Sequence, residues 1–98
     1  MYIDEHILQE IVHIATYFPS ITKIVLFGSR ARGDHKHTSD IDLAIYTTDS
    51  LAAFTYRLQT EVSTLLDFDI TDINTVDDPF FKEQINQEGI TIYEKPRF

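Results

Sequence analysis

Apolar positions in the first part of the chain repeat at the spacing of an amphipathic helix. One face carries five of them, and three more widen the stripe: Ile3, Ile7, Ile11, Ala15 and Phe18, then Leu8, Val12 and Ile14. This pattern predicts a helix over residues 4–17, which ends before Pro19 because proline cannot continue a helix. Residues 21–27 are too short and too uniformly apolar for a one-sided helix. They predict a strand buried on both faces.

The rest of the chain alternates between strand and helix patterns. Residues 40–46 place Asp40, Asp42 and Ala44 on one face of a predicted strand and Ile41, Leu43 and Ile45 on the other. A second long helix, for which Asp49 and Ser50 offer a cap, has the apolar seam Leu51, Phe54, Leu58, Val62 and Leu65. Residues 68–74 predict a third strand. Asp78 followed by Pro79 predicts the start of a helix that ends near Gly89, and residues 90–93 predict a short last strand.

This order of elements predicts an α/β (α+β) fold. We expect a mixed sheet of about four strands with helices mainly on one face. The chain has 98 residues, and two domains would leave neither half enough chain to bury a core. We therefore expect a single domain over residues 1–98.

Composition and charge exclude several classes of protein. A net charge of −8 argues against nucleic acid as the main partner, because proteins bind phosphate backbones through basic patches. The absence of cysteine removes disulfides, thiolate nucleophiles and cysteine zinc sites. No apolar run approaches the ~20 residues of a membrane span, so we expect no membrane association. The acidic start of the sequence lacks the layout of a secretion signal, which predicts a cytoplasmic protein.

Candidate chemistry gathers where the first strand ends. Gly28 and Ser29 follow that strand at once, and residues 29–32 predict a short helical turn with Ser29 as its cap. Free backbone N–H groups at such a junction can bind an anion, and glycine lets the anion approach the main chain closely. We therefore expect Gly28 and Ser29 to bind phosphate, with Arg30 and Arg32 adding charge nearby.

Two aspartates on the following strand predict a metal site. Asp40 and Asp42 leave the same face, with Cα atoms roughly 7 Å apart, and carboxylate ligands suit Mg²⁺ or Mn²⁺. Without a cation the two charges repel, so we expect a raised pKa for at least one of them. A further carboxylate is expected from the third strand. By parity we favour Asp69, with Asp67 and Asp72 as the alternatives. Three carboxylates can hold two metal ions for in-line displacement at phosphorus.

The pattern Gly-Ser, ten residues, Asp-x-Asp resembles the signature of the polymerase-beta-like nucleotidyltransferase superfamily, and most of all its minimal (MNT) branch. The resemblance covers nearly the whole chain, including Glu88-Gly89-Ile90 near its end. It implies that Gly28 and Ser29 bind phosphate and that Asp40 and Asp42 bind metal. It also implies that Asp69 binds metal and accepts the proton of the attacking hydroxyl. The implied reaction is transfer of a nucleoside monophosphate, most often AMP from ATP.

The same resemblance implies a protein partner. Larger members carry an added domain that binds the acceptor, whereas only five residues follow Tyr93 here. We therefore expect the acceptor to come from a second subunit or another protein. Short MNT chains resemble antitoxins that adenylylate a tyrosine of a HEPN-type ribonuclease toxin. Two alternatives stay open. One is a binding module that neutralises its partner by contact alone, and the other is a small-molecule nucleotidyltransferase that acts, for example, on an aminoglycoside.

Overall fold

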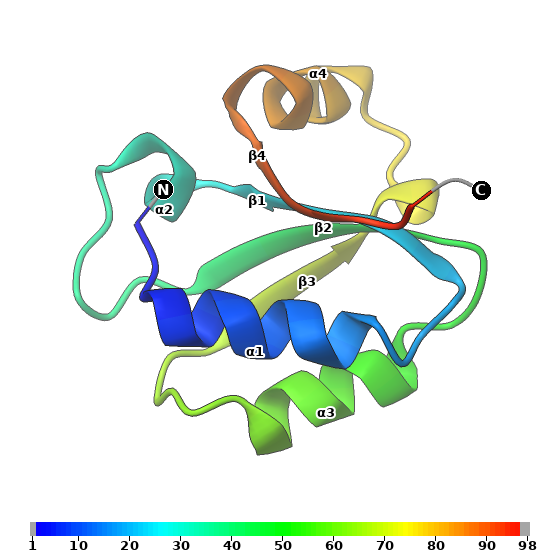
Figure 1. Ribbon diagram of the computed structural model, residues 1–98. Coiled ribbons are helices and arrows are strands. Elements are labelled where there is room, and N and C mark those ends of the chain that lie inside the picture. The colour runs from blue at the N-terminus through cyan, green and yellow to red at the C-terminus, as the bar shows by residue number, and fades with distance from the viewer. Residues whose placement is uncertain (1, 97–98) are drawn as a thin grey trace.

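A four-stranded mixed sheet forms the centre of the computed structural model, which describes residues 2–96 (Figure 1). The elements follow the predicted order. They are α1 (Glu5–Ala15), β1 (Ile21–Phe27), α2 (Ser29–Arg32), β2 (Ile41–Thr47), α3 (Ala52–Glu61), β3 (Phe68–Asp72), the 3-10 turn η1 (Ile73–Thr75), α4 (Pro79–Glu88) and β4 (Ile90–Glu94). The third predicted strand is therefore shorter than residues 68–74, because the chain turns into η1 after Asp72.

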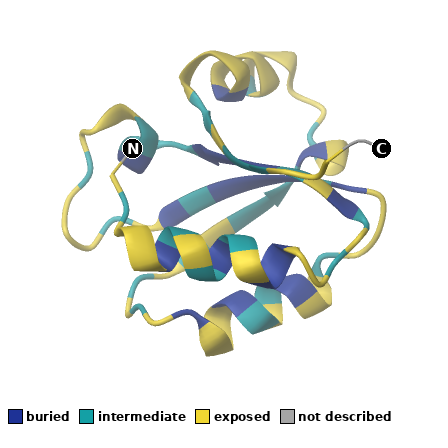
Figure 2. Cartoon of the chain, viewed as in Figure 1, coloured by how far each residue is buried: buried dark blue, intermediate teal, exposed yellow. Residues whose placement is uncertain are grey.

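The sheet has the strand order β3-β2-β1-β4. β1 pairs antiparallel with both β2 and β4, whereas β2 pairs parallel with β3. The central strands β1 and β2 are the most apolar strands and carry all the buried residues of the sheet (Figure 2). This agrees with the expectation that residues 21–27 are covered on both faces. The predicted mixed sheet of four strands is confirmed.

The two faces of the sheet are covered by different helices. α1 and α3 lie against one face, and α4 lies over the other (Figure 1). The larger apolar cluster lies under α1 and α3 and includes Ile11, Leu43 and Phe54, none of which is exposed. A smaller cluster of Val25, Ala44, Ile73 and Ile85 lies on the face that α4 covers. Among residues 2–96, no helix has the length and apolar character needed to cross a membrane.

One predicted core position is wrong. Leu65 was placed in the apolar seam of the second long helix, but its side chain is fully exposed. The helix ends at Glu61, four residues earlier. Glu10 of α1 then accepts hydrogen bonds from the backbone N–H and the hydroxyl of Ser63, at 2.8 and 2.9 Å. The chain therefore leaves the helical path, and the spacing of the seam no longer applies at Leu65.

Candidate active site at the glycine–serine corner

Gly28 forms a sharp corner between β1 and α2. Its φ of 72° lies in the left-handed region that favours glycine, and it occupies the N-cap position of α2. Ser29 is the first residue of the helix. The prediction that Ser29 caps the turn is therefore wrong by one position. The reason is that the chain needs a positive φ at the cap itself, and glycine provides it.

Gly28 also lies directly against a carboxylate of the protein. A Cβ atom at Gly28 would collide with Oδ2 of Asp42. The contact follows from the sheet register, since Phe27 on β1 pairs with Asp42 on β2. The space left by the missing side chain is thus occupied by Asp42, which brings the corner and the Asp-x-Asp strand into one site.

The parallel pairing of β2 and β3 places Asp42 beside Asp69, residue against residue. Burial raises the pKa of Asp42 to about 6, and the neighbouring charges of Asp69 and Asp40 add to the increase, while Arg32 opposes it. The prediction of a raised pKa within the acidic pair is confirmed. Asp40 precedes β2 and is exposed, as is Asp69.

The alternatives to Asp69 occupy different positions. Asp67 lies before β3, where its backbone carbonyl accepts a hydrogen bond from the N–H of Ile41 at 2.9 Å. Asp72 uses its side chain to cap η1, accepting a hydrogen bond from the N–H of Asn74 at 3.0 Å. Asp69 is therefore the acid of β3 that pairs with Asp42. Its assignment as a ligand stays a prediction.

Asp42 and Asp69 suit a divalent cation by their chemistry. Two carboxylates held side by side repel one another, and a hard cation between them would relieve that repulsion. Within residues 2–96, however, no three His, Cys, Asp or Glu side chains already converge as a metal-binding group. The structure thus brings two of the three predicted ligands together, with Asp40 close enough to act through its charge.

The two predicted phosphate-binding arginines point in different directions. Arg30 is buried, and its guanidinium donates hydrogen bonds to the backbone carbonyls of Tyr2, Lys36, His37 and Ser39 at 3.0–3.3 Å. These contacts hold the loop between α2 and β2 in place. The geometry gives no support to a nucleotide-binding role for Arg30, because its donors serve the loop.

Arg32 remains at the surface beside the corner. Its guanidinium forms ion pairs with Asp34 and Glu88, both at 3.2 Å, which raise its pKa. A cavity of about 190 Å³ lies next to it, lined by Phe27, Gly28, Arg32, Gln84, Ile85 and Glu88. Sequence reasoning did not assign Gln84 or Glu88 to the site. Glu88 is separated from Arg32 by 56 positions, and no local spacing links the two.

These features define the class of protein. A model of the family "Polymerase beta, Nucleotidyltransferase" matches residues 9–98. The chain belongs to this family, as its Gly-Ser corner and Asp-x-Asp strand suggested. A search of curated proteins found no match.

Several of the solved structures that are similar to this chain are toxin–antitoxin complexes. A chain of a toxin–antitoxin complex with AMP-PNP is 26% identical, with a TM-score of 0.71 over 90% of this chain and 73% of that chain. A chain of an MntA–HepT toxin–antitoxin variant is 24% identical, also with a TM-score of 0.71 over 90% of this chain and 73% of that chain.

A third similar chain comes from a tri-AMPylated Shewanella oneidensis HEPN toxin in complex with MNT antitoxin. It is 20% identical, with a TM-score of 0.63 over 91% of this chain and 71% of that chain. This third chain and the chain of the MntA–HepT variant are each less than 25% identical to the protein, and each likeness shows a shared fold. The predicted polymerase-beta-like fold is therefore confirmed.

Proposed function

We propose that this protein is an antitoxin that transfers AMP from ATP to a tyrosine of a HEPN-type toxin. The observation that carries the proposal is the alignment of Asp42 with Asp69 directly beside Gly28, in a chain of the nucleotidyltransferase family. Similar chains come from a complex with AMP-PNP and from one with an AMPylated HEPN toxin. These similarities support the nucleotide and the partner. We also propose that the reaction takes place in the cytoplasm, where ATP is available.

The residues of the site have distinct roles in this reaction. Asp40, Asp42 and Asp69 would hold Mg²⁺ or Mn²⁺, which neutralises charge on the phosphates when bound. The backbone N–H of Gly28 and the hydroxyl of Ser29 bind the β- and γ-phosphates, with Arg32 nearby. The tyrosine oxygen attacks the α-phosphorus and Asp69 accepts the tyrosine proton. The bond from the α-phosphorus to the bridging oxygen breaks, and pyrophosphate leaves. Positioning of the reactants supplies much of the acceleration.

The test is incubation of the protein with ATP, Mg²⁺ and a HEPN-type partner, such as the product of a neighbouring gene. Intact mass spectrometry should show the addition of AMP to the partner, and peptide mapping should locate it on tyrosine. Asp42→Asn should abolish the transfer while the circular dichroism spectrum stays that of the folded chain. Asp77→Asn, which changes an exposed acid outside the site, is the matched control. An unmodified partner in the presence of folded protein would refute the proposal.

A contact-only antitoxin is the second candidate. The observation that favours it is that residues 2–96 hold no preformed group of three metal-ligating side chains. The double variant Asp40→Asn with Asp42→Asn separates the two functions. If it neutralises the partner as well as the unchanged protein does, inhibition is by contact. If neutralisation is lost while the complex still forms, transfer is required.

A further inference from the structure

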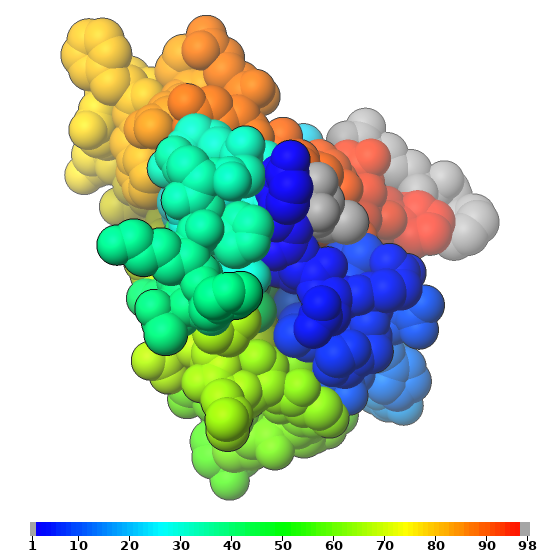
Figure 3. Space-filling view, turned by 90° about the vertical axis from the view of Figure 1, so that its left-hand side faces the viewer, coloured from blue at the N-terminus to red at the C-terminus, as the bar shows by residue number. Residues whose placement is uncertain are grey.

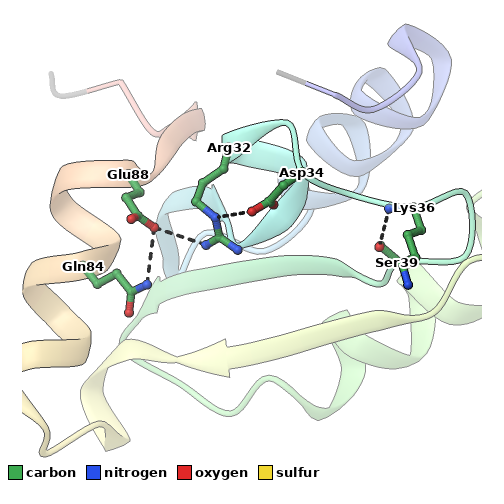
Figure 4. A network of polar contacts seen from close by, with 6 residues as sticks. All are labelled: Arg32, Asp34, Lys36, Ser39, Gln84 and Glu88. Carbon is green, nitrogen blue, oxygen red and sulfur yellow. Dashed lines mark hydrogen bonds and ion pairs between the residues drawn. The ribbon is translucent and has the colours of Figure 1, made fainter.

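Arg32 is held from two sides by carboxylates (Figure 4). Asp34 accepts a hydrogen bond from Nε, and Glu88 accepts one from Nη1, each at 3.2 Å. Gln84 donates a hydrogen bond to the same Glu88 oxygen at 3.4 Å. Among the described residues Nη2 of Arg32 has no hydrogen-bond partner, so its N–H groups are available to a ligand. The guanidinium is therefore held through Nε and Nη1 and is open at Nη2.

The fixed guanidinium lies at the candidate active site. It lines the cavity of about 190 Å³ together with Gly28, and its charge acts on Asp42. In the space-filling view, the cyan segment of α2 lies between the orange end of α4 and the blue amino-terminal segment (Figure 3). The Arg32–Glu88 pair bridges α2 and α4, which are far apart in sequence. This contact thus connects the last turn of α4 to the corner that the proposed phosphates would occupy.

We propose that Glu88 is a positioning residue, which holds Arg32 so that its free Nη2 binds the triphosphate of the nucleotide. The inference rests on the proposed function and adds a residue to it. Unrestrained, the arginine would be drawn toward Asp42 and its acidic neighbours, because opposite charges attract across the short distances of the site. Glu88 and Asp34 hold it apart from them. Arginine suits this role because it stays charged and has donors on three nitrogens, so Nη2 can bind phosphate while Nε and Nη1 bind the two carboxylates.

The first test compares two glutamates of α4. Glu88→Gln removes the charge that holds Arg32. Glu83→Gln is the matched control, since Glu83 is exposed on the same helix and also accepts a hydrogen bond from a glutamine, Gln87, at 2.9 Å. The probe is AMP-PNP with Mg²⁺, measured by calorimetry. We expect Glu88→Gln to weaken binding about threefold, and Glu83→Gln to leave it unchanged. Adenosine has no phosphates, so its binding should not change in either variant.

A charge swap separates positioning from structural support. Arg32→Glu combined with Glu88→Arg keeps an ion pair between α2 and α4 but moves the cation from α2 to the last turn of α4. The swap should restore the thermal stability lost in Arg32→Glu alone while AMP-PNP binding stays weak. Recovery of binding in the swap would overturn the proposal, as would equal affinities of Glu88→Gln and Glu83→Gln. If the unchanged protein binds no AMP-PNP, the proposed function itself fails, and this inference fails with it.

Discussion

At the scale of single residues, the site depends on the close approach of Gly28 and Asp42. The glycine has two separate reasons to be there: a φ of 72° and the carboxylate that fills the position of its missing Cβ. A left-handed backbone costs a residue with a side chain roughly 1–2 kcal/mol. A Cβ atom at position 28 would also displace Asp42. This displacement would weaken nucleotide binding, which backbone strain alone would not do.

Gly28→Ala should therefore lower both stability and nucleotide binding. Gly33→Ala is the matched control, because Gly33 also has a positive φ, of 99°, but its Cβ would meet the ring of Tyr2 instead of Asp42. We expect urea denaturation to show a loss of about 1–2 kcal/mol or more in both variants. Binding of AMP-PNP with Mg²⁺ should fall only in Gly28→Ala. Equal binding by the two variants would show that Asp42 tolerates the displacement.

The raised pKa of Asp42 makes stability depend on pH. The folded chain keeps the proton of Asp42 up to about pH 6, whereas the unfolded chain releases it near the ordinary value of 3.8. The contribution of Asp42 to stability is therefore fully present below pH 3.8 and is lost as the pH rises to about 6. In EDTA at pH 7.5, Asp42→Asn should raise the free energy of unfolding by about 1 kcal/mol, a figure reduced for solvent screening.

The same variant supplies its own pH control. The gain in Asp42→Asn should disappear as the pH falls below 3.8, where the group at this position is neutral in both the folded and the unfolded chain. Asp77→Asn, at an exposed acid outside the site, is the matched control. Urea titrations across this range measure both effects. A destabilised Asp42→Asn at pH 7.5 in EDTA would mean that the carboxylate forms favourable contacts in the metal-free protein.

At the scale of elements, the sequence predicts those whose signals are local. Alternation predicted β2 and β3, and the parity argument placed Asp69 on the face of Asp42. The end of α3 was not predictable from spacing, because a contact from Glu10 on another helix accompanies it. The inward turn of Arg30 was missed for a similar reason. Its partners are backbone carbonyls, which every residue has, so the sequence carries no signal that marks them.

α4 offers a test of a cap that the sequence did predict. Asp78 accepts hydrogen bonds from the N–H groups of Phe80 and Phe81 at 2.9 and 3.4 Å, and Pro79 occupies the first turn. Asp78→Ala should lower the free energy of unfolding by about 1 kcal/mol, because two N–H groups lose their acceptor. Asp77→Ala, one residue earlier, removes the same charge without the cap. Similar losses in the two variants would assign the effect to charge alone.

At the scale of the whole molecule, the site is a product of sheet topology. The order β3-β2-β1-β4 places β2 between the strand that carries Asp69 and the strand that leads to Gly28. An exchange of β2 with β3 would move Asp42 one strand away from the corner, and an exchange of β2 with β1 would separate Asp42 from Asp69. The sequence favoured a mixed sheet but did not fix the order of its strands, since order depends on contacts between distant segments.

The net charge of the molecule affects how strongly it binds a nucleotide. The chain carries a net charge of −8, and three acids lie near the proposed phosphate site, so free ATP is repelled unless a cation intervenes. We expect the affinity for ATP to be lower in EDTA than in Mg²⁺, by about tenfold or more.

The direction in which salt changes ATP affinity shows whether electrostatic repulsion causes this difference. Raising ionic strength from about 0.01 M to 0.15 M shortens the screening length from about 30 to 8 Å. In EDTA this should strengthen the binding of ATP, because the screened force is repulsive, whereas binding of uncharged adenosine should stay constant. Calorimetric titrations at the two salt concentrations measure both ligands. Equal ATP affinity with and without Mg²⁺ would mean that the acids of β2 and β3 do not act through a cation. If ATP binding in EDTA weakens as salt is added, the attraction of Arg32 and the backbone N–H groups for the phosphates outweighs the repulsion by these acids.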